Sequence, residues 1–489
     1  ITLEVSISGD GDEHNNVSLA GVPGRSSRAL PIKDMTIDLT ANAMQAAATY
    51  IGGAVGYLAT SDAMTITGLT STVTVQGGAE SVSIGSAHIG GVIGQFGAKA
   101  GEGGGAAGFT IGTTGNRKIN STLIIVGHIK STNTHVGGVI GLANQEVSIY
   151  GAEVKLAIAD EFKPSGGEES DGLGSVNYGG VVGLANHAKV ILANIYVRDE
   201  SYTAGEGAVT TKGLNLTTSA STPVAIGSLI GYSTHVISAS GGNLYSDLTI
   251  NSTSTAAGDS GTAALYIGGL VGYNSLADTY ANENIDTVLA NTAYIGTITV
   301  DLGDARGVSV GGIMGFLQGD ADSAPSITNS LFGGKIIIKE QNGQDVIVGG
   351  TIANANSDFA INNANNYGDV FIDYSGDDNA SSRMSSYKFG GIVGQINFEQ
   401  TGVDSEDGLG TITESNSMVT NHNARLAGSG ANTTNDQTGA IVGAGTLTTS
   451  TSNYYNSAVS LAFDDQGTDI GYSGASANGY GSSSDEDYI

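Results

Sequence analysis

Clusters of acidic side chains are the residues of this chain whose types and spacing could do chemistry. Carboxylate oxygens suit Ca²⁺, which takes about six to eight oxygen ligands. Three acidic loops qualify: Asp10, Asp12 and Glu13; Glu168, Glu169 and Asp171; and Asp404, Glu406 and Asp407. None of them follows an EF-hand loop or a calcium-binding nonapeptide repeat. Calcium is therefore the one cofactor that the sequence suggests, and a solvated acidic loop is the alternative.

Two adjacent acidic pairs, Asp377-Asp378 and Asp464-Asp465, could act as catalytic carboxylates. Enzymes that cleave polysaccharides use such pairs at separations of about 5 to 9 Å. Both pairs lie among Gly, Ser and Asn residues, where Asp commonly stabilises turns. The chain also lacks cysteine and the His-Glu-x-x-His motif of metallopeptidases. We therefore predict a protein that is not an enzyme, with a polysaccharide-active enzyme as an alternative.

Four of the seven histidines recur at matched offsets from a repeated glycine motif. His88 and His135 come two residues before its leading glycine, and His187 and His235 come four residues after its closing glycine. Other copies of the motif place Tyr50, Asn177, Ser309 and Lys388 at the first of these offsets. This variety predicts a solvent-facing position, so an ordinary surface ladder is favoured over a metal site.

The glycine motif itself returns ten times and sets the architecture, because self-similarity at a fixed period indicates a repeat protein. Its spacings run from 38 to 49 residues with a mean of 43. The leading glycines are Gly52, Gly90, Gly137, Gly179, Gly227, Gly268, Gly311, Gly349, Gly390 and Gly439.

Each copy of the motif combines glycines with aliphatic residues, which favour strands. In a single strand, Ile267, Gly269 and Val271 would share one face, and neither face would be polar. The alternative is that the glycines form bulges or tight corners. An apolar stripe either faces outward and promotes lateral packing or fills the core. Its members are Ala54, Val92, Val139, Leu229, Leu270, Ile313 and Ile392.

Further strand-like runs lie between the motifs, such as residues 147–150 and 335–339, and no run has a helical period of useful length. We predict an all-β fold, a right-handed parallel β-helix (β-solenoid) of about ten two-rung repeats, with two turns of roughly 20 residues in each repeat. Residues 1–45 would form an N-terminal strand and cap, residues 46–449 the repeat array, and residues 450–489 a C-terminal cap or docking tail.

The motif resembles the glycine-rich GLUG repeat, in which an aliphatic residue precedes Gly-Gly-Leu-Val-Gly and an Asn follows closely. Gly268 to Asn274 is the nearest match, while Gly227-Ser228 and Gly439-Ala440 lack the second glycine. The resemblance covers about four fifths of the chain. It implies a large secreted or surface-anchored bacterial protein such as an adhesin, and it implies no catalytic residues.

Composition fits an exported protein. The 47 acidic and 18 basic residues give a formal net charge of −29, which disfavours nucleic acid and anionic membranes as partners. Stability would come from stacked strands, since there are no cysteines to form disulfides. The chain begins with Ile1 and has no apolar run of membrane-spanning length, so we expect a removed signal peptide and no membrane insertion. The expected location is extracellular or at the cell surface.

The two ends are the expected contacts for self-assembly. An alternating strand places Ile1, Leu3, Val5 and Ile7 on one face, and the acidic C-terminal stretch ends in Tyr488 and Ile489. The strand could cover its own solenoid or add to a neighbouring subunit. Head-to-tail contacts that do not close into a ring produce a filament. We therefore predict a homopolymeric extracellular filament or sheath, with a monomeric adhesin that binds glycan or a host protein as the alternative.

Overall fold

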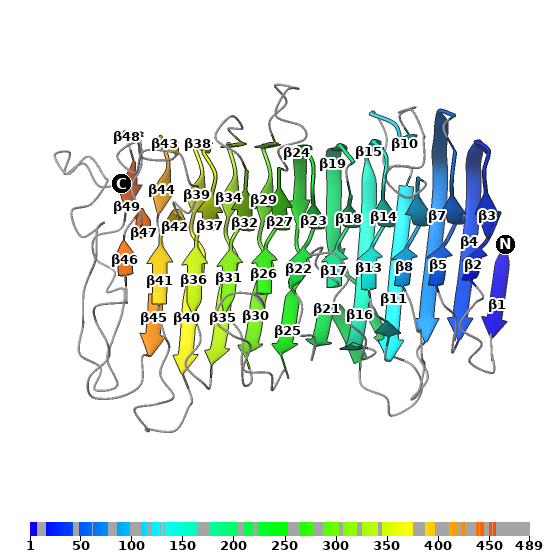
Figure 1. The fold of residues 1–489 in the computed structure, drawn as a ribbon, viewed down its shortest axis with the longest axis horizontal. Helices are drawn as coiled ribbons and strands as arrows, with labels where there is room; N and C mark the ends of the chain where they lie inside the picture. Colours follow the sequence, from blue (N-terminus) through cyan, green and yellow to red (C-terminus); the bar gives the residue numbers. More distant parts are fainter. Residues whose placement is uncertain are drawn as a thin grey trace. The chain divides into compact units, whose positions relative to one another are not determined.

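The computed structural model describes residues 1–6, 16–42, 48–60, 62–76, 86–97, 109–114, 119–127, 129–131, 133–164, 176–186, 188–203, 210–218, 223–252, 265–276, 287–302, 307–319, 325–340, 345–374, 387–396, 410–417, 422–425, 437–439, 441–444, 449–451 and 453–455. They belong to two compact units, Ile1–Thr253 (unit 1) and Ser254–Ile489 (unit 2). Every regular element in the described part of the chain is a β-strand (Figure 1).

Unit 1 contains three sheets, one of long strands (sheet 1) and two of short strands (sheets 2 and 3). Sheet 2 contains β2 (Asn16–Ala20), β5 (Ala48–Gly52), β8 (Ser86–Gly90), β13 (Asn133–Gly137), β17 (Val176–Gly179) and β22 (Val224–Gly227). Sheet 3 contains β3 (Arg25–Ser26), β6 (Val55–Leu58), β9 (Ile93–Phe96), β14 (Ile140–Ala143), β18 (Val182–Ala185) and β23 (Ile230–Ser233). Sheet 1 contains β1 (Thr2–Ser6), β4 (Ile32–Asn42), β7 (Met64–Gln76), β10 (Phe109–Gly112), β11 (Ile119–Gly127), β12 (Lys130–Ser131), β15 (Val147–Tyr150), β16 (Ala152–Pro164), β19 (Val190–Asp199), β20 (Ser201–Thr203), β21 (Thr210–Thr218), β24 (Ile237–Leu244) and β25 (Leu248–Ser252).

Unit 2 repeats the same three sheets. Sheet 2 contains β26 (Leu265–Gly268), β31 (Val308–Gly311), β36 (Val346–Gly349), β41 (Tyr387–Gly390) and β46 (Gln437–Gly439). Sheet 3 contains β27 (Val271–Ser275), β32 (Met314–Gln318), β37 (Ile352–Asn356), β42 (Val393–Ile396) and β47 (Val442–Ala444). Sheet 1 contains β28 (Val288–Ala290), β29 (Ala293–Tyr294), β30 (Thr297–Leu302), β33 (Ser326–Thr328), β34 (Leu331–Phe332), β35 (Lys335–Glu340), β38 (Ala360–Asn362), β39 (Asn365–Asn366), β40 (Asp369–Tyr374), β43 (Thr411–Thr413), β44 (Asn416–Ser417), β45 (His422–Arg425), β48 (Thr449–Thr451) and β49 (Tyr454–Tyr455).

The predicted parallel β-helix is confirmed, but each repeat makes one coil rather than two. Gly52 pairs with Gly90, and Gly90 pairs with Gly137, so consecutive copies of the motif are direct neighbours in a parallel sheet. The same holds for Gly268 and Gly311 in unit 2. The two-rung expectation is wrong because the strands of sheet 1 are long, with 13 residues in β7, and a single coil therefore takes up most of a repeat.

The glycine motif forms a bend between two strands and not one strand with two apolar faces. In the best copy, β26 ends at Gly268, Gly269 and Leu270 form the bend, and β27 begins at Val271. The alternative that the glycines form tight corners is therefore the right one. The apolar stripe fills the core, since Val92, Val139 and Leu270 have no exposed surface, so the outward-facing interpretation of the stripe is wrong.

Close approach of neighbouring backbones explains the glycines. A β-carbon on Gly52 would lie 1.9 Å from the Val55 carbonyl oxygen and 2.6 Å from the Gly94 nitrogen of the next coil. One on Gly91 would lie 2.2 Å from the Gly138 oxygen. Sheet 1 also reaches the bend, because the Ser71 hydroxyl donates a hydrogen bond of 2.7 Å to the Gly91 carbonyl. The corner therefore points inward, toward sheet 1.

Sheet 1 has its own bend, made by residues with positive φ at matching positions of successive coils. In unit 2 these are Asn291, Asn329, Asn363 and Glu414, with φ between 51° and 54°. In unit 1 they include Asp34, Gly68, Gly151, Asn194 and Gly241. Asparagine and glycine tolerate this left-handed conformation better than other residues do. The asparagines also form a ladder, in which the Asn363 amide donates to Asn329 (2.7 Å) and the Asn329 amide to Asn291 (3.2 Å).

Candidate assembly surface

The first coil lies at the edge of unit 1. β2 and β3 each have a hydrogen-bonded neighbour on one side only among the described strands, β5 and β6 respectively. β1 covers the second half of β4 in parallel register, from Thr2 opposite Asp38 to Ser6 opposite Asn42. The amino group of Ile1 donates to the Thr36 carbonyl (2.9 Å). The N-terminal strand therefore pairs with its own chain and leaves β2, β3 and the first half of β4 as open edges.

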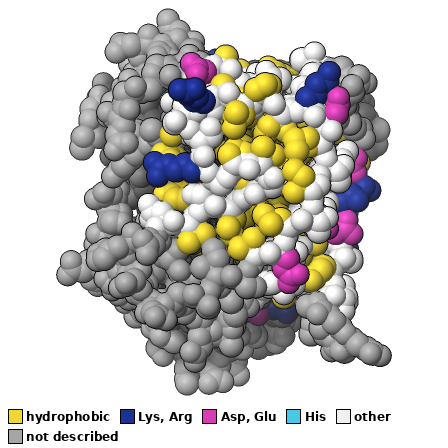
Figure 2. Space-filling view, turned by 90° about the vertical axis from the view of Figure 1, so that its right-hand side faces the viewer, with side chains coloured by type: hydrophobic (Ala, Val, Ile, Leu, Met, Phe, Trp, Pro, Cys, Tyr) yellow, Lys and Arg dark blue, Asp and Glu magenta, His cyan; other side chains and the backbone are white. Residues whose placement is uncertain are grey.

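Exposed apolar side chains gather on this first coil. Among the described residues, eight large hydrophobic residues are exposed, and four of them lie within residues 1–30. These four are Ile1 (58% exposed), Leu3 (37%), Val22 (43%) and Leu30 (37%). Figure 2 shows hydrophobic side chains grouped over this end of unit 1, with both basic (Lys, Arg) and acidic (Asp, Glu) side chains at the margin. Such a grouping on a sheet edge is typical of a protein contact.

One stretch of the first coil is basic, although β4 also contains the exposed Asp34 and Asp38. Residues 16–33 contain Arg25, Arg28 and Lys33 but no acidic residue, in a chain with 47 acidic and 18 basic residues. All three basic side chains are exposed. The Arg25 guanidinium lies 4.8 Å from the centre of the Tyr57 ring, and Lys33 lies 3.9 Å from Asp34. We name this surface, made by Ile1, Leu3, Val22, Arg25, Arg28, Leu30 and Lys33, the first-coil surface.

Few of the residues singled out by sequence lie on this surface. Ile1 and Leu3 do, and Val5 is half-buried in β1. Ile7, Tyr488 and Ile489 lie outside the described residues, as do Asp377, Asp378, Asp464 and Asp465. All three acidic loops (Asp10, Asp12 and Glu13; Glu168, Glu169 and Asp171; Asp404, Glu406 and Asp407) lie outside as well. Within the described part of the chain, no group of three or more His, Asp or Glu side chains could hold a metal ion.

The repeat also has an earlier, degenerate copy that sequence analysis missed. Ala20-Gly21-Val22-Pro23-Gly24 occupies the motif position of the first coil, because Ala20 pairs with Gly52. Only Gly21 and Gly24 remain as a signal, and the region that was expected to be a cap therefore contains a complete coil of β2, β3 and β4.

The histidine ladder is buried, which corrects the expectation of a solvent-facing position. His88 and His135 are each 6% exposed and stack with ring centres 5.0 Å apart and planes 15° apart. Tyr50 stacks on His88 (5.4 Å), and the Asn177 amide nitrogen lies 3.1 Å from His135 Nδ1. The residues two positions before the leading glycine face away from the core and lie beside the inward-pointing bend. On the outer side of this bend, the rings of Tyr50 and Tyr57 stack with their centres 5.1 Å apart. Side chains that meet across a bend bury one another.

Burial controls the charge of these histidines. Removal from water lowers the pKa of His135 to about 3, against a weaker opposing effect of the backbone at Thr134. Removal from water and the neighbouring His135 hold the pKa of His88 well below 6.5. Both rings are therefore neutral near pH 7. His235 is also buried, and its Nδ1 accepts a hydrogen bond from the Val236 nitrogen (2.6 Å), while His187 lies outside the described residues.

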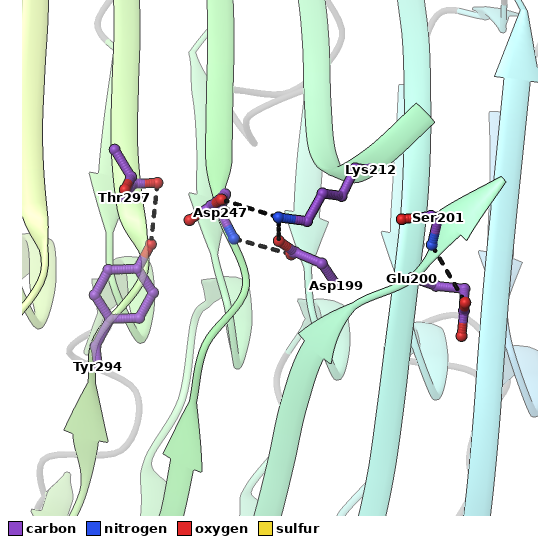
Figure 3. A network of polar contacts seen from close by, with 7 residues as sticks. All are labelled: Asp199, Glu200, Ser201, Lys212, Asp247, Tyr294 and Thr297. Carbon is purple, nitrogen blue, oxygen red and sulfur yellow. Dashed lines mark hydrogen bonds and ion pairs between the residues drawn. The ribbon is translucent and has the colours of Figure 1, made fainter. Parts of the chain in front are cut away.

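A polar cluster marks the place where a hairpin interrupts sheet 1 of unit 1 (Figure 3). Asp199 accepts a hydrogen bond from the Asp247 nitrogen (3.0 Å), and Lys212 lies 3.4 Å from Asp199 and 3.9 Å from Asp247. Removal from water raises the pKa of Asp199. Since the Asp199 carboxylate joins its own coil to the backbone of the next coil, the cluster has a structural role at the start of the antiparallel pair β20–β21.

Two further contacts in Figure 3 are local. The Ser201 nitrogen donates to Glu200 (3.3 Å) in unit 1, and the Tyr294 hydroxyl donates to the Thr297 carbonyl (3.5 Å) in unit 2.

Comparison with protein-family models, with curated proteins and with solved structures found no match. The resemblance to the GLUG repeat therefore depends on the motif alone. None of the described residues belongs to a helix that is long and apolar enough to cross a membrane.

Proposed function

We propose that this chain is a secreted, non-enzymatic structural protein whose copies associate through the first-coil surface into an extracellular filament or sheath. The observation that supports the proposal most strongly is the grouping of Ile1, Leu3, Val22 and Leu30 beside open strand edges. An open edge is a template for strands of another chain, and exposed apolar side chains add a favourable contact. Pro23 and Pro31, which flank β3, lack an N–H group, so β2 and the first half of β4 are the edges best able to pair.

The test is sedimentation velocity over a hundredfold range of concentration. The wild-type chain should form species larger than a monomer, and the double variant Val22→Glu/Leu30→Glu should stay monomeric. The matched control is Tyr367→Glu, which changes an equally exposed apolar residue (51%) of unit 2 and should assemble as the wild type does. A wild-type chain that is monomeric at every concentration would refute the proposal, as would equal loss of assembly in the control.

A second candidate function is that of an adhesin that binds glycan through the Tyr50 and Tyr57 pair. These rings are partly exposed, stack at 5.1 Å and lie next to the exposed Arg25, and aromatic faces with nearby polar groups suit sugar rings. A glycan array probed with monomeric wild type and Tyr57→Ala tests this function. Saturable binding that the variant loses would support it, and no binding by the wild type would exclude it for the glycans on the array.

A further inference from the structure

We propose that the partner of the first-coil surface is the acidic segment 456–489 of a second copy. This inference rests on the proposed function and specifies it, since it names the part of the neighbouring chain that each first coil binds. It makes the contact heterologous, so that every copy offers one surface and one segment, and copies whose contacts do not close into a ring extend into a filament.

Charge complementarity is the first argument. Segment 456–489 contains Asp464, Asp465, Asp469, Asp485, Glu486 and Asp487 and no basic residue. Residues 16–33 of the first coil contain three exposed basic residues and no acidic residue. Two copies that each carry a net charge of −29 repel one another in most orientations. An acidic segment is therefore directed to a locally basic surface.

The arrangement of apolar residues is the second argument. Asp485, Glu486 and Asp487 are followed at once by Tyr488 and Ile489. The first-coil surface also combines the two kinds of residue, since the exposed Val22 and Leu30 flank Arg25 and Arg28 in the sequence. Apolar contacts at the centre of an interface with charged pairs at its rim are typical of specific protein contacts. The pairing of acidic residues of the segment with basic residues of the surface would fix the orientation of the segment, and the apolar contacts would supply most of the affinity.

Competing charges near the surface define where the segment binds. Glu4, Asp34 and Asp38 are exposed on β1 and β4, and Asp34 lies beside Lys33. These carboxylates weaken the positive field over the β4 part of the surface. Arg25 and Arg28, which lie in and just after β3, are therefore the residues that we expect to bind the segment most strongly.

The direct test uses a fluorescent peptide of residues 479–489 and the full chain at a concentration where it is monomeric. We expect saturable binding by fluorescence anisotropy, at least tenfold weaker binding to Arg25→Glu/Arg28→Glu, and a similar loss in 0.5 M NaCl, because exposed charges are screened at that ionic strength. A peptide with the same residues in scrambled order is the control. Equal binding of both peptides, or binding unaffected by the arginine variant, would overturn the inference.

A charge exchange separates this inference from the proposed function. Arg25→Glu/Arg28→Glu and Asp485→Lys/Glu486→Lys/Asp487→Lys should each lose assembly in sedimentation velocity, and a mixture of the two variants should regain it. Circular dichroism checks that both variants keep the fold of the wild type. If the tail variant assembles normally while Val22→Glu/Leu30→Glu does not, this inference is wrong and the proposed function stands. If the wild type never assembles, the proposed function fails first.

Discussion

The coils of the two units follow the same backbone path, but they have different residue types beside the glycine bend and at the bend of sheet 1. Beside the glycine bend, unit 1 stacks Tyr50, His88, His135 and Asn177, and unit 2 has Tyr266, Ser309, Ile347 and Lys388 at the same positions of its coils. At the bend of sheet 1, unit 1 uses mostly glycine and unit 2 uses a ladder of asparagines.

The difference teaches which parts of the repeat are dictated by backbone geometry. The motif glycines recur in both units, because in either unit a β-carbon would lie about 2 Å from a carbonyl oxygen, of the same coil for the leading glycine and of the next coil for the second. The flanking positions need only fill space beside the bend, so aromatic, imidazole, amide and aliphatic side chains are all accepted. We therefore expect unit 1 to differ from unit 2 in its response to pH, although their coils are alike.

The largest expected effect comes from the shared feature. Gly91→Val in unit 1 and Gly312→Val in unit 2 should each destabilise their unit by more than about 3 kcal/mol, because the built β-carbons lie 2.2 Å and 2.3 Å from the carbonyl oxygens of Gly138 and Gly350. Urea denaturation measures the loss. Gly333→Ala is the control and should be close to neutral, since its nearest neighbour is 4.0 Å away. A tolerated valine at either bend would contradict the backbone explanation.

Acidification should distinguish the two units. Because the folded-state pKa values of His88 and His135 lie below the ordinary 6.5, the unfolded chain binds more protons, and stability falls as pH decreases from about 6.5 toward 3. Each histidine contributes a slope of about 1.4 kcal/mol per pH unit. Tyr50 stacks on His88 and on Tyr57, Tyr57 contacts Arg25, and none of these three groups is a carboxylate.

Hydrogen exchange between pH 7 and 4.5, corrected for the intrinsic exchange rate, measures this loss of stability. The protection of β8 and β13 in unit 1 should fall more than that of β31 and β36 in unit 2. The variant His88→Asn/His135→Asn copies the amide that Asn177 supplies in the same column and should flatten the profile. An unchanged pH dependence in that variant would show that other groups control acid stability.

The bend of sheet 1 should show a smaller effect. Asn329→Ala in unit 2 loses two ladder hydrogen bonds and places at φ 51° a residue that tolerates the left-handed conformation less well than asparagine, for a cost of roughly 1–2 kcal/mol. Asn329→Gly also loses these hydrogen bonds, but glycine adopts a positive φ without strain, so this variant should lose less stability than the alanine variant. Urea midpoints of the two variants test the order, and a glycine variant weaker than the alanine variant would mean that the ladder matters more than the backbone conformation.

Surface ion pairs should matter least. Lys155 and Glu200 lie 3.4 Å apart and are about one-third exposed, so Lys155→Ala should change the stability of unit 1 by less than about 0.5 kcal/mol. Urea denaturation of the wild type and of this variant, in low and in high salt, measures the change in stability. A loss of stability above about 1.5 kcal/mol would show that this ion pair anchors the hairpin made by β20 and β21.

The fold was predictable from sequence because the glycine period reflects contacts between backbones. The number of coils was not, since the long strands of sheet 1 have polar outward faces and resemble two short strands joined by a turn. The asparagine bends did leave a signal, as in Asn329-Ser330, but a sequence does not show that these residues stack on one another. Their alignment follows only from the register of sheet 1.

The candidate surface was only partly predictable. Alternation of Ile1, Leu3 and Val5 indicated an edge strand. Val22 lies in a degenerate motif copy that the pattern did not include, and Leu30 lies between β3 and β4, where no pattern marked it. The predicted exposure of the histidines was wrong for a physical reason. Varied residue types at one motif position usually indicate contact with solvent, but here the side chains at this position are buried against others across a concave bend. The predicted calcium loops fall outside the described residues, so calcium binding stays a prediction.

The most direct test of the central claim, association through the first coil, compares hydrogen exchange of the wild-type chain at dilute and assembling concentrations. We predict that assembly protects amides within residues 16–37, which include β2, β3 and the first half of β4, while β31 and β36 in unit 2 exchange as before. Assembly that leaves residues 16–37 unprotected, or protects only other strands, would contradict the account.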